Sequence, residues 1–167
     1  MTVSMYGISA PVFVRLLKNL STLLDKGQAH ADTKKIASGV FPESRLIADM
    51  FPLSRQVQIA TDQVKGAMAR LAGVEVPKYE DNEQTIEELK ARIAKTIAFI
   101  ESFKPEQING TEERDIALTM GGKEYKFKGE AYLLESVLPN FYFHVVTAYN
   151  ILRQNGVDIG KRDFLAK

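Results

Sequence analysis

The sequence has no cysteine and no tryptophan, and neither sign of charge dominates it. The absence of cysteine excludes disulfide bonds, thiolate metal sites and cysteine nucleophiles. Lys and Arg number 22 against 21 Asp and Glu, and the net charge of +1 gives no field that would attract nucleic acid or an anionic membrane. We therefore expect neither a nucleic-acid partner nor a membrane partner.

Long hydrophobic runs are also missing, because no stretch reaches the roughly 18 uncharged apolar residues that a membrane span needs. The amino-terminal segment has no basic residue before Arg15 and leads into an amphipathic pattern, so we expect no export signal and predict a cytoplasmic protein. The 167 residues, 45% of them hydrophobic, are enough for one sizeable core and too few for two. We predict one domain over 1–167.

Apolar residues recur at three- and four-residue steps in four segments, which is the spacing of helices that bury one face. The predicted helices span residues 9–26, 52–72, 85–102 and 139–154. A proline in the first turn marks the start of three of them, because its missing N–H would have no helical partner there. The third begins at Thr85, which forms a capping box with Glu88.

Other residues suggest where these helices end and which faces are exposed. We expect the first helix to fray near Gly27 and the last to end at Gly156, a residue type suited to the left-handed conformation after a helix. Residues 129–137 are expected to lead into the last helix. The charged residues of the third helix, Arg92 among them, are interpreted as its solvated face.

The pattern changes from helical to alternating after Asn109–Gly110. Ile116, Leu118 and Met120 face one way, and the pair Gly121–Gly122 suits a tight turn, which predicts a β-hairpin near 115–128. Because an isolated hairpin is only marginally stable, its apolar face should lie against the helices. The predicted fold class is therefore all-α, a four-helix bundle with a small β-hairpin inserted before the last helix.

His144, on the flank of the apolar stripe of the last helix, is the most chemically suggestive residue. Three interpretations remain open: a histidine hydrogen-bonded across the bundle, part of a small-molecule pocket, or a metal ligand. Sites in bundles are built from facing helices. The residues expected to converge in such a pocket are Asn140, His144, Tyr149, Gln56 and Asp49. The other histidine, His30, lies in a polar segment and is expected at the surface.

Several short motifs resemble one group of helical bundles. They are Asp49–Leu53, Ala69–Gly73, Pro139–His144, Ala148–Tyr149 and Gly160–Asp163. Together with the four helices and the inserted hairpin, they resemble a branch of the DinB-like superfamily that is catalogued only as a domain of unknown function. The likeness covers nearly the whole chain, and the branch carries no assigned activity.

In metal-binding relatives, the resemblance implies one histidine from the second helix and two, four residues apart, from the last helix around a divalent ion such as zinc or nickel. The corresponding residues here are Gln56, His144 and Ala148, so two of the three ligands are missing. A methyl group cannot coordinate, and an amide is a poor ligand for the metals that imidazole suits. We therefore expect a degenerate site without metal ligands or a resident cofactor.

Two hypotheses for the function follow. The first, which we favour, is a non-catalytic small-molecule-binding or interaction protein. The second is a metal-dependent enzyme of the DinB-like type, a small-thiol transferase or hydrolase, that uses His144 with a divalent metal such as Zn or Ni and unrecognised oxygen ligands. No catalytic residue can be assigned. A homodimer is expected, but no residue identifies its interface.

Overall fold

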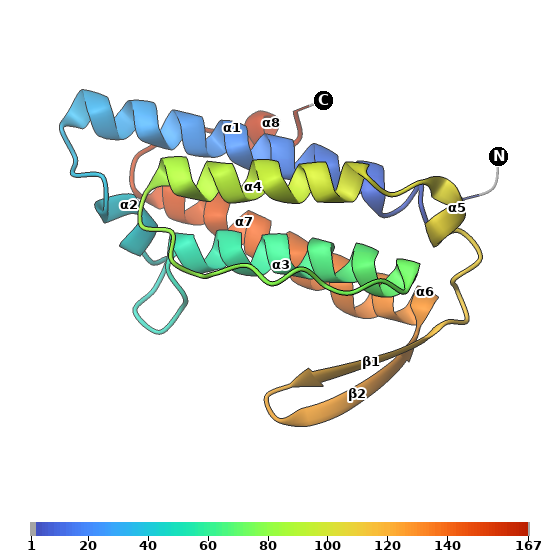
Figure 1. The fold of residues 1–167 in the computed structure, drawn as a ribbon. Coiled ribbons are helices and arrows are strands. Elements are labelled where there is room, and N and C mark those ends of the chain that lie inside the picture. Colours follow the sequence, from blue (N-terminus) through green and yellow to red (C-terminus); the bar gives the residue numbers. More distant parts are fainter. Residues whose placement is uncertain (1–2, 167) are drawn as a thin grey trace.

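The structure is a computed structural model that describes residues 3–166, apart from the side chain of Met120. Four long helices form a bundle (Figure 1). They are α1 (Ala10–Lys34), α3 (Leu53–Ala72), α4 (Ile86–Glu101) and α7 (Leu138–Gln154). Helices α4 and α7 each pack against both α1 and α3, so they lie diagonally opposite one another. The predicted four-helix bundle is confirmed.

Short elements connect these helices. They are α2 (Val40–Glu43), α5 (Pro105–Ile108), α6 (Gly129–Ala131), the π-helix η1 (Tyr132–Val137) and α8 (Lys161–Phe164). Helix α2 buries Phe41, whose ring stacks on His30 at 6.1 Å between centroids. His30 is therefore half-buried at the end of the bundle, where the sequence predicted a surface position.

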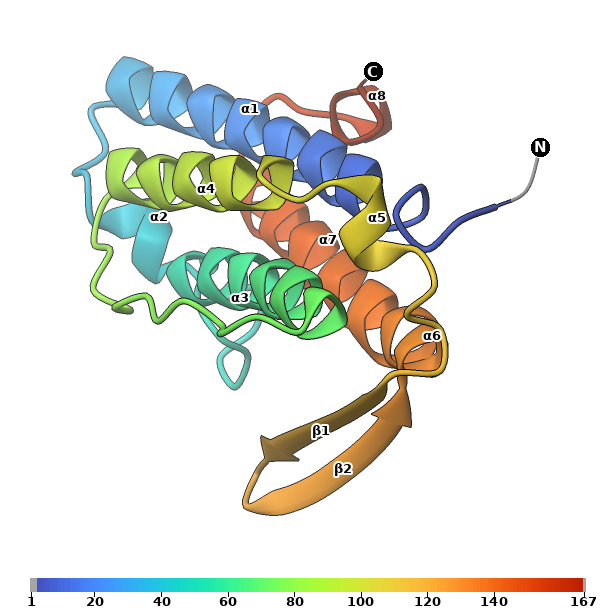
Figure 2. The ribbon, with the colours of Figure 1, turned by 45° about the vertical axis from the view of Figure 1, so that its right-hand side comes forward.

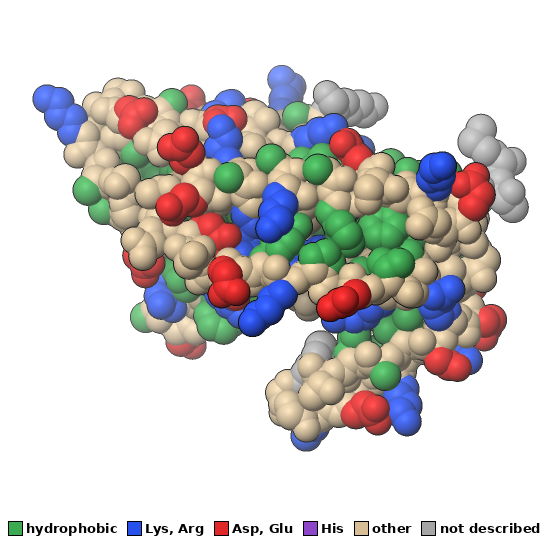
Figure 3. All heavy atoms as spheres, viewed as in Figure 1, with side chains coloured by type: hydrophobic (Ala, Val, Ile, Leu, Met, Phe, Trp, Pro, Cys, Tyr) green, Lys and Arg blue, Asp and Glu red, His purple; other side chains and the backbone are tan. Residues whose placement is uncertain are grey.

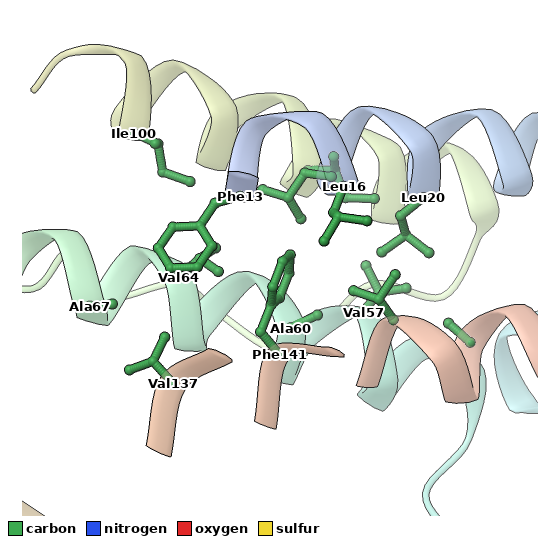
Figure 4. Close-up of a cluster of buried hydrophobic side chains, with 14 of the residues drawn as sticks. Phe13, Leu16, Leu20, Val57, Ala60, Val64, Ala67, Ile100, Val137 and Phe141 are labelled. Carbon is green, nitrogen blue, oxygen red and sulfur yellow. The ribbon is translucent and has the colours of Figure 1, made fainter. Parts of the chain in front are cut away.

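The core lies between the four long helices (Figure 4). Phe13 of α1 and Phe141 of α7 meet edge to face at its centre, with ring centroids 5.4 Å apart. Leucines and valines from α1 and α3 surround this pair, and each fully buried side chain of this size contributes roughly 2 kcal/mol. This packing sets the rotation of α3 and α7 and therefore determines which of their residues face each other.

Helix α1 is longer than predicted, because it continues past Gly27 and ends before Lys35, which adopts the left-handed conformation with φ 56°. Gly27 is buried where α1 approaches its neighbours most closely. A Cβ atom there would lie 3.0 Å from Leu152 and 3.7 Å from Ile86. The glycine thus permits close packing, which outweighs its helix-propensity cost of about 1 kcal/mol.

The last helix begins earlier than predicted, because α6, η1 and α7 follow one another without a break from Gly129 to Gln154. Pro139 lies inside this helical run and does not start it. A proline cannot donate to the carbonyl of the preceding turn, and its ring crowds that carbonyl. The wider turn of η1, Tyr132–Val137, is separated from Pro139 only by Leu138 and accommodates the ring without ending the helix.

The predicted hairpin is present as the antiparallel strands β1 (Asp115–Met120) and β2 (Lys123–Lys128). Its base packs on the bundle, because Ile116 is buried and Phe127 lies 6.0 Å from Tyr132 between ring centroids. Its tip projects away from the helices (Figure 2), and Tyr125 is exposed. The apolar face therefore packs against the core at Ile116, Phe127 and the half-buried Leu118. The predicted orientation of the Met120 side chain lies outside the described residues.

The surface carries charge of both signs. Figure 3 shows Lys and Arg side chains interspersed with Asp and Glu over one face of the molecule. Among the helices described in residues 3–166, none combines the length and the apolar character needed to cross a membrane.

Candidate functional site

His144 of α7 points toward α3 and is held there by Gln56. Its Nδ1 lies 2.7 Å from Gln56 Oε1, and Gln56 Nε2 donates to the carbonyl oxygen of Phe51 at 2.9 Å. Because the amide nitrogen of Gln56 is used by that carbonyl, its oxygen must accept, so His144 Nδ1 carries the proton. The imidazole is therefore the Nδ1–H tautomer, with a lone pair on Nε2.

The loop before α3 brings further residues to this imidazole. Its two ends are joined by a hydrogen bond from the backbone N–H of Leu53 to the carbonyl of Ser44 at 2.9 Å. Arg45 Nη1 donates across the loop to the carbonyl of Met50 at 2.6 Å. These bonds fold the loop back so that Met50 and Phe51 lie beside α7.

A cleft of about 200 Å³ opens between this loop and α7. It is lined by Asp49, Met50, Phe51, Gln56, Phe143 and His144. His144 Nε2 has no hydrogen-bond partner among the described residues, where no fully buried side-chain nitrogen or oxygen lacks one. Solvent therefore reaches Nε2, and the cleft presents an unused hydrogen-bond acceptor beside aromatic walls.

The environment of His144 keeps its side chain uncharged. The residue is only 8% exposed, and this burial, with a smaller contribution from the positive charge of Arg55, lowers the pKa of its imidazole from 6.5 to about 4. Both causes disfavour the imidazolium ion. At neutral pH the ring is thus a neutral acceptor at Nε2.

Of the five residues predicted to converge, the structure brings Asp49, Gln56 and His144 together. Tyr149 lies on another flank of α7, where its ring packs against Phe164 at 6.2 Å between centroids. Asn140 is half-buried and does not line the cleft, because the loop before α3 approaches α7 over the following turn. The convergence predicted for Asn140 and Tyr149 is therefore wrong.

The helical periodicity of the sequence does not predict the apolar walls of the cleft. Phe143 was overlooked because it falls outside the buried stripe of α7, although it directly precedes His144. Met50 and Phe51 directly precede Pro52, and this pairing of large apolar residues with a helix start was the available signal.

The side-chain atoms near His144 that could ligate a metal do not fit a three-histidine metal centre. Gln56 uses both of its polar atoms in hydrogen bonds, and Ala148 is fully buried with only a methyl group to offer. His144 Nε2 and the Asp49 carboxylate are the remaining side-chain groups around the cleft that could ligate a metal. Within residues 3–166, no group of three or more His, Cys, Asp or Glu side chains is arranged to hold a metal ion.

The sequence matches a family model described as a domain of unknown function, DUF1993, over residues 5–165. The chain belongs to the DUF1993 family. It is also similar to the crystal structure of a DinB family member protein from Shewanella denitrificans, with 40% sequence identity and a TM-score of 0.87. That likeness covers 97% of this chain and 92% of the other, and it confirms the predicted DinB-like resemblance. A comparison with curated proteins finds no match.

This DUF1993 chain also contains a second polar cluster, centred on Arg92 of α4. Arg92 has a side chain that is only 2% exposed and lies 2.9 Å from Asp62, 3.0 Å from Asp81 and 3.0 Å from Glu83. Its Nε donates to Thr61 Oγ1 at 2.8 Å. The prediction that Arg92 belongs to a solvated face is wrong, because acidic residues of the 73–85 connection cover it.

Tyr79 completes this cluster. Lys65 Nζ and Lys95 Nζ lie 3.8 and 4.1 Å from the centroid of its ring, and the guanidinium of Arg92 lies 5.3 Å from it. Cations in these positions are attracted by the ring face. The cluster ties the 73–85 connection to α3 and α4, and we interpret it as structural.

Proposed function

We propose that this protein is a non-catalytic binding protein that holds a small molecule in the His144 cleft. One observation carries the proposal: Gln56 holds His144 Nδ1 at 2.7 Å, which leaves Nε2 as an oriented, uncharged acceptor in a cleft of about 200 Å³. A buried polar group whose geometry is fixed by a neighbour is suited to select a ligand by hydrogen bonding.

The chemistry of the cleft favours a ligand with a hydrogen-bond donor and an apolar body. His144 Nε2 and the Asp49 carboxylate both accept hydrogen bonds. Phe51 and Phe143 supply aromatic surface for an apolar body. The Phe51 ring already lies 5.9 Å from the Arg55 guanidinium, so Phe143 is the ring that can attract a further cation. The volume is smaller than the roughly 300 Å³ at which drug-sized pockets begin. A small amine attached to an apolar group satisfies all of these features.

The pKa of His144 supports binding over acid–base catalysis. A general base works best when its pKa is close to the operating pH. A side chain with a pKa of about 4 is a weak base at neutral pH, so it accepts a hydrogen bond but removes protons poorly. The same burial that weakens it as a base makes it a discriminating acceptor.

A metal-dependent enzyme that uses His144 is the second candidate. One observation favours it, because Asp49 lines the same cleft and a carboxylate can ligate zinc. One imidazole and one carboxylate are fewer than the three protein ligands of catalytic zinc sites. We therefore favour the small-molecule-binding protein, in which the metal site is degenerate, over the metal-dependent enzyme.

The binding proposal can be tested with 2-phenylethylamine as a probe and phenylacetate as a probe of similar size and opposite charge. We expect the amine to shift the NMR signals of residues around the cleft and phenylacetate to leave them unchanged. The shifts should disappear in His144→Ala and persist in His30→Ala, the matched change at the other histidine. Equal binding by the wild type and His144→Ala would contradict the proposal.

Metal analysis separates the two candidates. Protein purified without an affinity tag should contain far less than one equivalent of zinc or nickel, and His144→Ala should not change that content. Near-stoichiometric metal in the wild type that is lost in His144→Ala would favour the enzyme.

A further inference from the structure

The outward face of α7 is apolar and exposed. Tyr142, Phe143 and Val146 are 38%, 55% and 39% exposed, although aromatic and β-branched side chains are usually buried. Helix α7 packs against α1 and α3 and lies diagonally opposite α4, so this face is turned away from the rest of the bundle. An apolar helix face of this kind is typical of an interaction surface.

The sequence of this face is symmetric about position 144, although the His144 side chain itself points the other way, toward α3. Tyr142 and Val146 lie two residues to either side of it, and Glu135 and Arg153 lie nine residues to either side. Both charged residues are exposed, and neither forms an ion pair within the described part of the chain. The face therefore has an apolar centre with opposite charges at its two ends.

We propose that this face binds a second copy of the chain, with the two α7 helices antiparallel and a two-fold axis on the outward side of α7, level with position 144. An antiparallel copy places Glu135 opposite Arg153 of the second copy, and Tyr142 opposite Val146 of the second copy. Each contact then occurs twice, as a two-fold interface requires. A parallel copy would instead place like charges together at both ends, which is unfavourable.

The composition of the face agrees with a protein interface. Interfaces concentrate aromatic residues at the centre and place charged residues at the rim, which is the order found from Tyr142 outward to Glu135 and Arg153. The net charge of +1 per chain gives little repulsion between two copies. Phe143 belongs to both surfaces, because it also lines the His144 cleft. The pairing of Tyr142 with Val146 and of Glu135 with Arg153 does not rest on what the cleft binds.

The proposed α7 interface can be tested by measuring the oligomeric state of the protein. Light scattering should give twice the mass of one chain for the wild type and half that value for Val146→Glu, which buries a charge at the centre of the interface. Val40→Glu is the matched control, because Val40 is 47% exposed but lies in α2. Circular dichroism should show that both variants are folded. A monomeric wild type, or a Val146→Glu variant that remains dimeric, would overturn the proposal.

Cross-linking tests the orientation, and the absence of cysteine makes it selective. We would oxidise Glu135→Cys and Arg153→Cys separately and as a mixture. Only the mixture should form a disulfide-linked dimer, because opposed positions meet while equivalent positions lie about 27 Å apart along the helices. The mixed dimer also retains one Glu135–Arg153 pair. Disulfide-linked dimers in either single variant alone would indicate a parallel arrangement and overturn the proposal.

Discussion

Gln56 Oε1 lies 2.7 Å from His144 Nδ1, and this contact joins α3 to α7 at the cleft. It confirms the interpretation that His144 is hydrogen-bonded across the bundle. The same contact determines the tautomer, because the other polar atom of Gln56 donates to the Phe51 carbonyl. A histidine can thus be part of the fold through one nitrogen and present the other to solvent.

Replacing Gln56 by Glu should raise the pKa of His144 by more than one unit. A carboxylate in place of the amide oxygen favours the imidazolium ion, whereas burial and Arg55 now disfavour it. The titration can be followed by NMR of the imidazole nitrogens, with His30 as an internal control. Gln56→Leu should not raise the pKa, because it adds no charge. A Gln56→Glu variant whose His144 still titrates near 4 would show that the contact does not control the charge state.

His144 should make the protein less stable in acid. Its pKa is about 4 in the folded chain, against the ordinary value of 6.5 that applies to the unfolded chain, so the unfolded chain binds the proton first. The neutral ring makes its full contribution to the free energy of unfolding above about pH 6.5, and this contribution is lost as the pH falls toward 4. The loss is at most about 3.5 kcal/mol, because the pKa differs by about 2.5 units and each unit corresponds to about 1.4 kcal/mol.

Urea unfolding of the wild type and His144→Phe measures this effect, because the carboxylates titrate in both proteins. The difference in free energy of unfolding should shift in favour of the variant between pH 7 and pH 4. A difference that is constant over this range would mean that His144 has the same pKa in both states.

Arg92→Met should lower the free energy of unfolding by about 3 kcal/mol, the usual cost of breaking a buried ion pair. The side chain of Arg92 is almost inaccessible and contacts Asp62, Asp81 and Glu83, which would lose their common partner. Lys95→Met is the control, since it removes one cation from Tyr79 at a cost of about 0.5–1 kcal/mol. Equal effects of the two changes in urea unfolding would refute the structural role of Arg92.

The double change Gln56→His with Ala148→His should create measurable affinity for zinc or nickel. Residues 144 and 148 lie one turn apart on one face of α7, and Gln56 faces them from α3. Ala148 is fully buried, so the larger side chain should cost about 1–3 kcal/mol of stability. Calorimetric titration would detect binding, and either single change should bind more weakly. No binding by a folded double variant would show that the three positions do not converge.

The residues that mark helix ends were sufficient to predict the bounds of α3 and α4. Thr85 and Glu88 form the predicted capping box, and Gly73 ends α3 in the left-handed conformation with φ 72°. Local signals failed at Gly27 and Pro139. At both positions the preference of one residue to interrupt a helix is outweighed, in one case by close packing and in the other by a widened turn.

The sequence predicted those parts of the candidate site whose positions depend on helix phase alone. His144 and Gln56 could be placed because each lies on the flank of an apolar stripe. The walls at Met50 and Phe51 depend on how a loop folds back, which is determined by hydrogen bonds between its ends and has no periodic signature. The burial of Arg92 likewise depends on a separate connection crossing over it.

The uninterrupted helix from Gly129 to Gln154 has a mechanical consequence. The β-hairpin is attached at one end of this rod, and His144 lies about 20 Å along it. A stiff rod transmits rotation, whereas a flexible joint would absorb it. The hairpin and the cleft are therefore joined through one continuous helix, with no loop between them to act as a flexible joint.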